Sequence, residues 1–189
     1  MDYLKIFAPA TVANVSCGFD SLGFAVDAVG DEITFTKTAE KGVKITTITG
    51  ADLTYDIDKN AASAVVKKIL NAANADFGIE LTIHKGFSPG SGLGSSAASA
   101  AGAAFGANKL LGNRYSKLEL TKFAMFGEEV ACGSQIADNV AAAIYGGFIL
   151  VRSYNPLDIV KLPVPSELRV VAIHPQITIK TKDARAVLP

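Results

Sequence analysis

The chain has 189 residues, a length typical of one domain with a substantial buried core. Apolar residues make up 49% of it and charged residues 19%, and the formal net charge is zero, so its charge favours neither nucleic acid nor an acidic membrane as a partner. No apolar run reaches membrane-spanning length, and residues 1–5 show no signal-peptide pattern, which predicts a cytoplasmic protein. Cys17 and Cys132 lie far apart among small residues and are predicted to be free thiols.

Strands are predicted from short apolar runs and from alternation of apolar and polar residues. The predicted strands cover residues 4–9, 31–38, 43–49, 79–83, 148–151 and 168–173. His84 falls on the polar side at the end of the fourth, which favours a solvated histidine over a catalytic one. Residues 10–23 are rich in glycine, serine, asparagine and aspartate, and are predicted to form a partly buried loop. Asn14 and Asp20 in that loop could bind a polar ligand or cap turns.

Helices are predicted between these strands from apolar periodicity and terminal residues. They cover residues 60–75, a run that ends near 111, a segment that begins with a capping box at Ser116 and Glu119, and residues 136–145. Glu128 and Glu129 lie near the end of the third helix, and because adjacent helical residues point about 100° apart, at most one of them can face a given site. The order of strands, then helices, then strands predicts an α+β fold.

The stretch from 88 to 99, Ser-Pro-Gly-Ser-Gly-Leu-Gly-Ser-Ser-Ala-Ala-Ser, carries the strongest functional pattern. Three glycines at alternate positions lead directly into an alanine-rich helix, with Ser95 and Ser96 at the junction. A glycine loop before a helix N-terminus suits a phosphate group. A Walker loop would need lysine where Ser95 stands, and a dinucleotide fingerprint would need an acidic residue where residues 114–116 have none.

From Gly90 onward this stretch matches the phosphate loop of the GHMP kinases, P-x-G-x-G-L-G-S-S-A-A, although the proline is shifted to Pro89. Residues 9–23, 138–147 and 181–189 resemble three further motifs of the homoserine kinases within that superfamily. The resemblance implies an α+β GHMP kinase N-terminal domain over residues 1–189, of the ribosomal protein S5 domain 2-like type with a left-handed crossover. It implies ATP-dependent phosphorylation of L-homoserine to O-phospho-L-homoserine in threonine biosynthesis.

The resemblance also implies a nucleotide site. Ser96 and Glu128 would hold Mg²⁺, and the spacing back from Asp138 favours Glu128 over Glu129. The residues expected to bind ATP are Asn60, Ser88, Pro89, Gly90, Ser91, Gly92, Leu93, Gly94, Ser95, Ser96, Ala97 and Ala98.

The substrate site implied by the resemblance lies in the other three motifs. Asn14, Asp20, Asn139 and Arg185 would contact L-homoserine, since an amino acid needs a cation for its carboxylate and acids or amides for its ammonium group. Asp138 would lie beside the substrate hydroxyl, as a general base or, as we favour, as a positioning group. Phosphoryl transfer depends mainly on positioning and charge neutralisation.

Two features depart from the family pattern. Ile136 stands where homoserine kinases often have histidine, and the second GHMP domain that family members carry after the last motif is expected to be absent from this chain. The alternatives are therefore another GHMP kinase that acts on a different small alcohol, or a non-catalytic nucleotide-binding domain that is inactive alone. A homodimer is also left open.

Overall fold

The long strand β2 (Leu22–Thr38) organises the sheet of the computed structural model, which describes residues 2–173. β1 (Tyr3–Ala13) pairs with it antiparallel, with a register shift between Pro9 and Thr11. The C-terminal half of β2 also pairs with β4 (Gly78–His84), and its N-terminal end pairs with β5 (Phe148–Tyr154). The start of β2 and the loop before it therefore lie next to β5, whereas its end lies next to β4.

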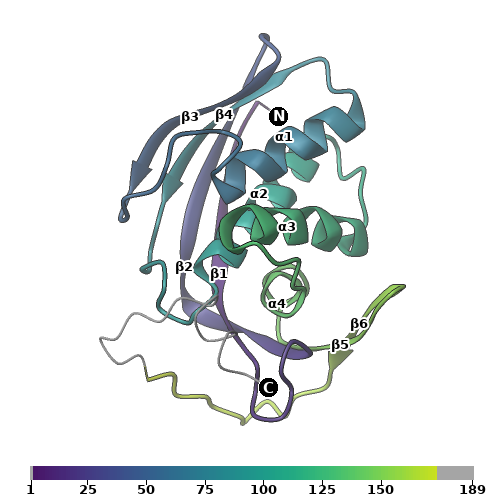
Figure 1. The fold of residues 1–189 in the computed structure, drawn as a ribbon. Coiled ribbons are helices and arrows are strands. Elements are labelled where there is room, and N and C mark those ends of the chain that lie inside the picture. Colours follow the sequence, from purple (N-terminus) through teal and green to yellow (C-terminus); the bar gives the residue numbers. More distant parts are fainter. Residues whose placement is uncertain (1, 174–189) are drawn as a thin grey trace.

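The six-stranded sheet has the order β3-β4-β2-β5-β6, with β1 attached to β2 (Figure 1). β3 (Gly42–Thr49) runs parallel to β4, and β6 (Leu157–Leu162) runs antiparallel to β5. A parallel pair needs a crossover connection, which here contains helix α1 (Ala61–Ala73). The fold is mixed α+β, as predicted.

Helices α1, α2 (Ser95–Leu110), α3 (Lys117–Cys132) and α4 (Asp138–Tyr145) lie on one side of the main sheet (Figure 1). The alanine-rich sequence of α2 lets this helix lie directly on the strands. A Cβ atom added at Gly106 would come within 2.2 Å of the Phe35 ring. Because α2 packs against the sheet and against the three other helices, it is buried on nearly all sides.

Side chains cap the starts of α1 and α3, and the capping box predicted at the start of α3 is confirmed. The Asn60 side chain accepts a hydrogen bond from the Ala62 N–H and caps α1. Ser116 and Glu119 form a reciprocal capping box at the start of α3. The capping box depends only on local sequence, which is why it could be predicted.

Three strand predictions need correction. Residues 10–13 continue β1 and residues 22–23 begin β2, so the predicted loop is shorter at both ends. β6 was not predicted, because the prolines that flank it indicated loops. Residues 168–173 form no strand; Val171 and Ile173 are 83% and 87% exposed, and no described strand pairs with them. Their β propensity has no sheet partner to act on among residues 2–173.

His84 is exposed at the end of β4, as predicted, and its Nδ1 lies 2.8 Å from the Thr49 hydroxyl. Within residues 2–173, no helix combines the length and the apolar character needed to cross a bilayer. Among residues 2–173 neither Cys17 nor Cys132 forms a disulfide, in agreement with the prediction that no disulfide joins them.

Candidate functional site

A cavity of about 930 Å³ opens between the glycine loop, the segment before α1, the C-terminal end of α3 and the start of α4. It brings together residues from all the predicted motifs that the structure describes. The predicted site residues that line it are Asn14, Asn60, Pro89, Gly90, Gly92, Gly94, Ser95, Ser96, Glu128, Asp138 and Asn139. Ser88, Ser91, Leu93, Ala97 and Ala98 do not line it, and Ala97 and Ala98 are buried in α2.

Gly94 holds the glycine loop against β1 and α4. Its φ is +68°, and a Cβ atom there would lie 2.1 Å from the Thr11 hydroxyl and 2.8 Å from Asn139 Oδ1. The Thr11 N–H also donates a 2.9 Å hydrogen bond to the Leu93 carbonyl. Both the backbone conformation and the close approach therefore require glycine at this position.

The N-terminus of α2 is open toward the cavity. Gly94 is its N-cap residue and supplies no side-chain cap, so the N–H groups of the first turn have no capping oxygen. Ser95 Oγ is buried and has no hydrogen-bond partner among residues 2–173. Uncapped amides at the positive end of a helix favour an anion such as phosphate.

Glu128 points into this cavity and Glu129 does not. Glu128 is 7% exposed, and its Oε1 has no hydrogen-bond partner within the described residues. Burial raises the pKa of Glu128 to about 7; the Asp138 charge adds to the rise, while a hydrogen bond with Ser96 and the Lys85 charge oppose it. Glu129 is exposed and accepts a 2.6 Å hydrogen bond from Gln135. The geometry thus places Glu128 beside Ser96, as the predicted metal pair requires.

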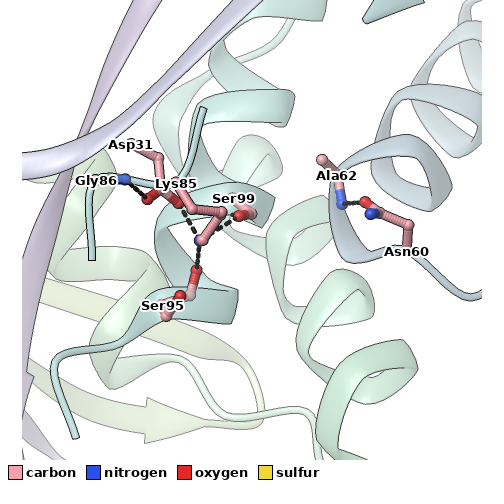
Figure 2. A network of polar contacts seen from close by, with 7 residues as sticks. All are labelled: Asp31, Asn60, Ala62, Lys85, Gly86, Ser95 and Ser99. Atoms are coloured by element: carbon pink, nitrogen blue, oxygen red, sulfur yellow. Dashed lines mark hydrogen bonds and ion pairs between the residues drawn. The ribbon is translucent and has the colours of Figure 1, made fainter. Parts of the chain in front are cut away.

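A buried ion pair between Lys85 and Asp31 lies beside the first turns of α2, which directly follow the glycine loop (Figure 2). The Lys85 ammonium also donates to the Ser95 carbonyl at 2.8 Å and to Ser99 Oγ at 2.9 Å. Asp31 accepts further hydrogen bonds from the Gly86 N–H and the Ser99 hydroxyl, both at 3.1 Å. Burial lowers the pKa of Lys85, and the Asp31 charge opposes this shift. The pair ties β2 and the end of β4 to the first turns of α2.

Lys85 and Asp31 were not predicted as site residues, although their positions in the sequence follow a pattern. Lys85 is in phase with Ile79, Leu81 and Ile83, and Asp31 is in phase with Ile33 and Phe35. Alternate residues of a strand face the same side, so each charge falls on an apolar face. Burying a charge in that position costs folding free energy unless an opposite charge lies next to it. Each of the two residues therefore predicts a buried partner of opposite charge.

Asn60 lines the cavity, but both ends of its side-chain amide have partners within its own segment. Its Oδ1 caps α1 (Figure 2), and its Nδ2 donates to the Thr54 carbonyl at 3.0 Å. The structure therefore gives Asn60 a defined role in shaping the cavity wall.

The predicted substrate residues form two groups. Asn14 and Asp20 both have positive φ, and Asn14 Oδ1 accepts a 2.8 Å hydrogen bond from the Asp20 N–H. Asp20 itself does not line the cavity. Asp138 is 1% exposed and accepts a 2.6 Å hydrogen bond from the Asn139 N–H. Arg185 lies outside the described residues.

The chain is similar to known proteins in sequence and in fold. The GHMP kinase N-terminal domain family matches residues 60–147. A crystal structure of homoserine kinase from Cytophaga hutchinsonii matches the fold with a TM-score of 0.91 and 51% sequence identity, over 100% of this chain and 61% of that one. Residues 60–147 therefore form a GHMP kinase N-terminal domain.

The whole chain is also similar to two curated proteins. A homoserine kinase from Chlorobium phaeobacteroides is 47% identical over 97% of this chain and 61% of its own length. A homoserine kinase from Methanococcus vannielii is 44% identical over 100% of this chain and 63% of its own length. The chain therefore spans less than two thirds of the length of these relatives.

Proposed function

We propose that the protein is a homoserine kinase, which transfers the γ-phosphoryl group of ATP to the side-chain hydroxyl of L-homoserine. The observation that carries this proposal is the single cavity shared by the glycine loop, the buried Glu128 and the Asp138–Asn139 pair. Similarity to homoserine kinases along the whole chain supports the choice of substrate.

The nucleotide phosphates would lie on the glycine loop and the first turn of α2. The residues there fit Mg²⁺, because the Glu128 carboxylate has a buried oxygen without a partner among residues 2–173 and lies next to the Ser96 hydroxyl. The described residues hold no cluster of three or more His, Cys, Asp or Glu side chains suited to a metal. Two protein oxygens suffice, because Mg²⁺ in kinase sites is commonly held by one or two carboxylates together with substrate phosphates. The ion would neutralise charge on the transferred phosphoryl group.

Homoserine would lie between the two groups of substrate residues. The Asp20 carboxylate suits the substrate ammonium, and the Arg185 guanidinium suits its carboxylate. The Asp138 carboxylate would accept a hydrogen bond from the reacting hydroxyl and fix its direction. Its own orientation is set by the Asn139 N–H. We favour this positioning role over proton abstraction.

One observation favours an alternative substrate. Ile136 lines the cavity where the homoserine kinase pattern often has histidine. An apolar side chain there removes one polar contact for an amino acid, so another small alcohol is the second candidate.

Initial rates of ADP formation in the whole protein, with homoserine and ATP varied separately, test the assignment. Glu128→Gln should lower turnover by about 100-fold, because charge neutralisation at the phosphates is lost, whereas Glu129→Gln should behave as the parent does. Arg185→Lys should raise the KM for homoserine about tenfold with little change in the KM for ATP, since lysine cannot form two parallel bonds to a carboxylate. Equal losses in the two glutamate variants would contradict the metal assignment. If Arg185→Lys changes only the KM for ATP, the arginine belongs to the nucleotide site and not to the substrate site.

A further inference from the structure

We infer that Tyr154 is a positioning residue for the amino-acid substrate, because its hydroxyl joins the loop of Asn14 and Asp20 to the start of α4. The hydroxyl donates a 2.7 Å hydrogen bond to the Asp20 carbonyl and accepts one of 3.2 Å from the Ala137 N–H. Ala137 immediately precedes Asp138. One side chain thus links the two groups of proposed substrate residues, and the inference rests on the proposed function.

The Asp20 backbone is held from both sides. Its N–H donates to Asn14 Oδ1 at 2.8 Å, and its carbonyl accepts from Tyr154. Asp20 adopts a left-handed conformation, with φ of 56°. Such a conformation persists when its surroundings hold it in place. The direction of the Asp20 carboxylate should therefore depend on the hydroxyl of Tyr154.

The placement of Tyr154 follows from the sheet. It is the last residue of β5, whose first residues pair with Leu22–Phe24 at the start of β2. In addition, the Val151 N–H donates a 2.7 Å hydrogen bond to the Ser21 carbonyl. Figure 1 shows α4, β5 and the loop between β1 and β2 at the same end of the molecule. These backbone bonds keep β5 beside the loop whether or not Tyr154 carries a hydroxyl.

A purely structural role and a positioning role predict different results. Tyr154 is 42% exposed, so water can replace its hydrogen bonds in a phenylalanine variant, and the loss of folding stability should be small. Binding of the substrate ammonium requires a particular direction of the Asp20 side chain, which water would not maintain. The effect should therefore appear in the use of homoserine and not in that of ATP.

Tyr154→Phe in the whole protein tests the inference, with Tyr55→Phe as the matched control. Tyr55 also accepts a backbone hydrogen bond through its hydroxyl, from the Ile48 N–H at 2.9 Å, but on β3. Tyr154→Phe should raise the KM for homoserine about three- to tenfold and leave the KM for ATP and the melting temperature nearly unchanged. The Ala137 amide should exchange its hydrogen faster. Tyr55→Phe should change neither the KM for homoserine nor that exchange.

Each remaining outcome counts against the inference or against the proposed function. An unchanged KM for homoserine, an equal rise of both KM values, or a Tyr154→Phe protein that does not fold would overturn the positioning role. If the parent protein does not phosphorylate homoserine, the proposed function fails. If the exchange rate at Ala137 is the same in Tyr154→Phe as in the parent, the hydrogen bond between Ala137 and Tyr154 does not form, and the inference fails.

Discussion

Replacing Glu128 by glutamine should change how the stability of the protein depends on pH. Glutamine has nearly the same shape as glutamate but does not titrate, so the variant isolates the charge of one buried carboxylate. Because burial raises the pKa of Glu128 to about 7, the folded state binds this proton more tightly than the unfolded state does. The contribution of the group to stability is then fully present below its ordinary pKa of 4.5 and is lost as pH rises through about 7.

The size of this effect follows from the shift itself. A pKa raised from 4.5 to about 7 corresponds to a loss of about 3 kcal/mol in the free energy of unfolding across that range. Glu128 is 7% exposed, so solvent screens the effect little. The free energy of unfolding of Glu128→Gln, relative to that of the parent, should therefore rise by about 3 kcal/mol between pH 4.5 and pH 8.

Urea denaturation of the whole protein at a series of pH values, with chelator and without nucleotide, measures this difference. The exposed neighbour provides the control, because Glu129→Gln changes the same charge outside the cavity. Its stability curve should run parallel to that of the parent. If the Glu128→Gln curve is also parallel to the parent curve over this range, Glu128 is not a buried carboxylate with a raised pKa, and the electrostatic description of the cavity is wrong.

Two further predictions concern the support of the glycine loop. Gly94→Ala should destabilise the protein by about 1–3 kcal/mol more than Gly92→Ala, because both positions have positive φ but only the Cβ atom at Gly94 would meet other atoms; thermal denaturation measures both, and equal losses would show that the close approach is unimportant. Lys85→Met should cost about 3–5 kcal/mol in urea denaturation, because it leaves the buried Asp31 unpaired, and a second change, Asp31→Leu, should recover part of that loss. A double variant that is less stable than Lys85→Met alone would contradict this explanation.

The parts of the fold that could be predicted from the sequence are those determined locally. Alternating strands, the capping box of α3 and the glycine loop each depend on a few neighbouring residues. The same local reasoning failed at residues 168–173, where β propensity is high but no described strand pairs with them. It also failed at β6, which is flanked by prolines yet pairs along β5.

The sequence predicted eleven of the 23 residues that line the cavity. It did not predict the raised pKa of Glu128, which depends on burial that only the packed structure shows. Asp31 and Lys85 lie 54 positions apart, and Tyr154 lies 134 positions from Asp20. No local pattern links such pairs, although the charges on apolar strand faces show that partners for Asp31 and Lys85 must exist.

Phosphorus NMR of the reaction product tests the proposed function most directly. The whole protein is incubated with ATP, Mg²⁺ and, in separate reactions, L-homoserine, mevalonate or shikimate. We expect a new phosphate monoester with L-homoserine, identified as O-phospho-L-homoserine, and much slower product formation with the other two alcohols. A monoester formed faster from mevalonate or shikimate than from L-homoserine, or none from any of the three, would contradict it.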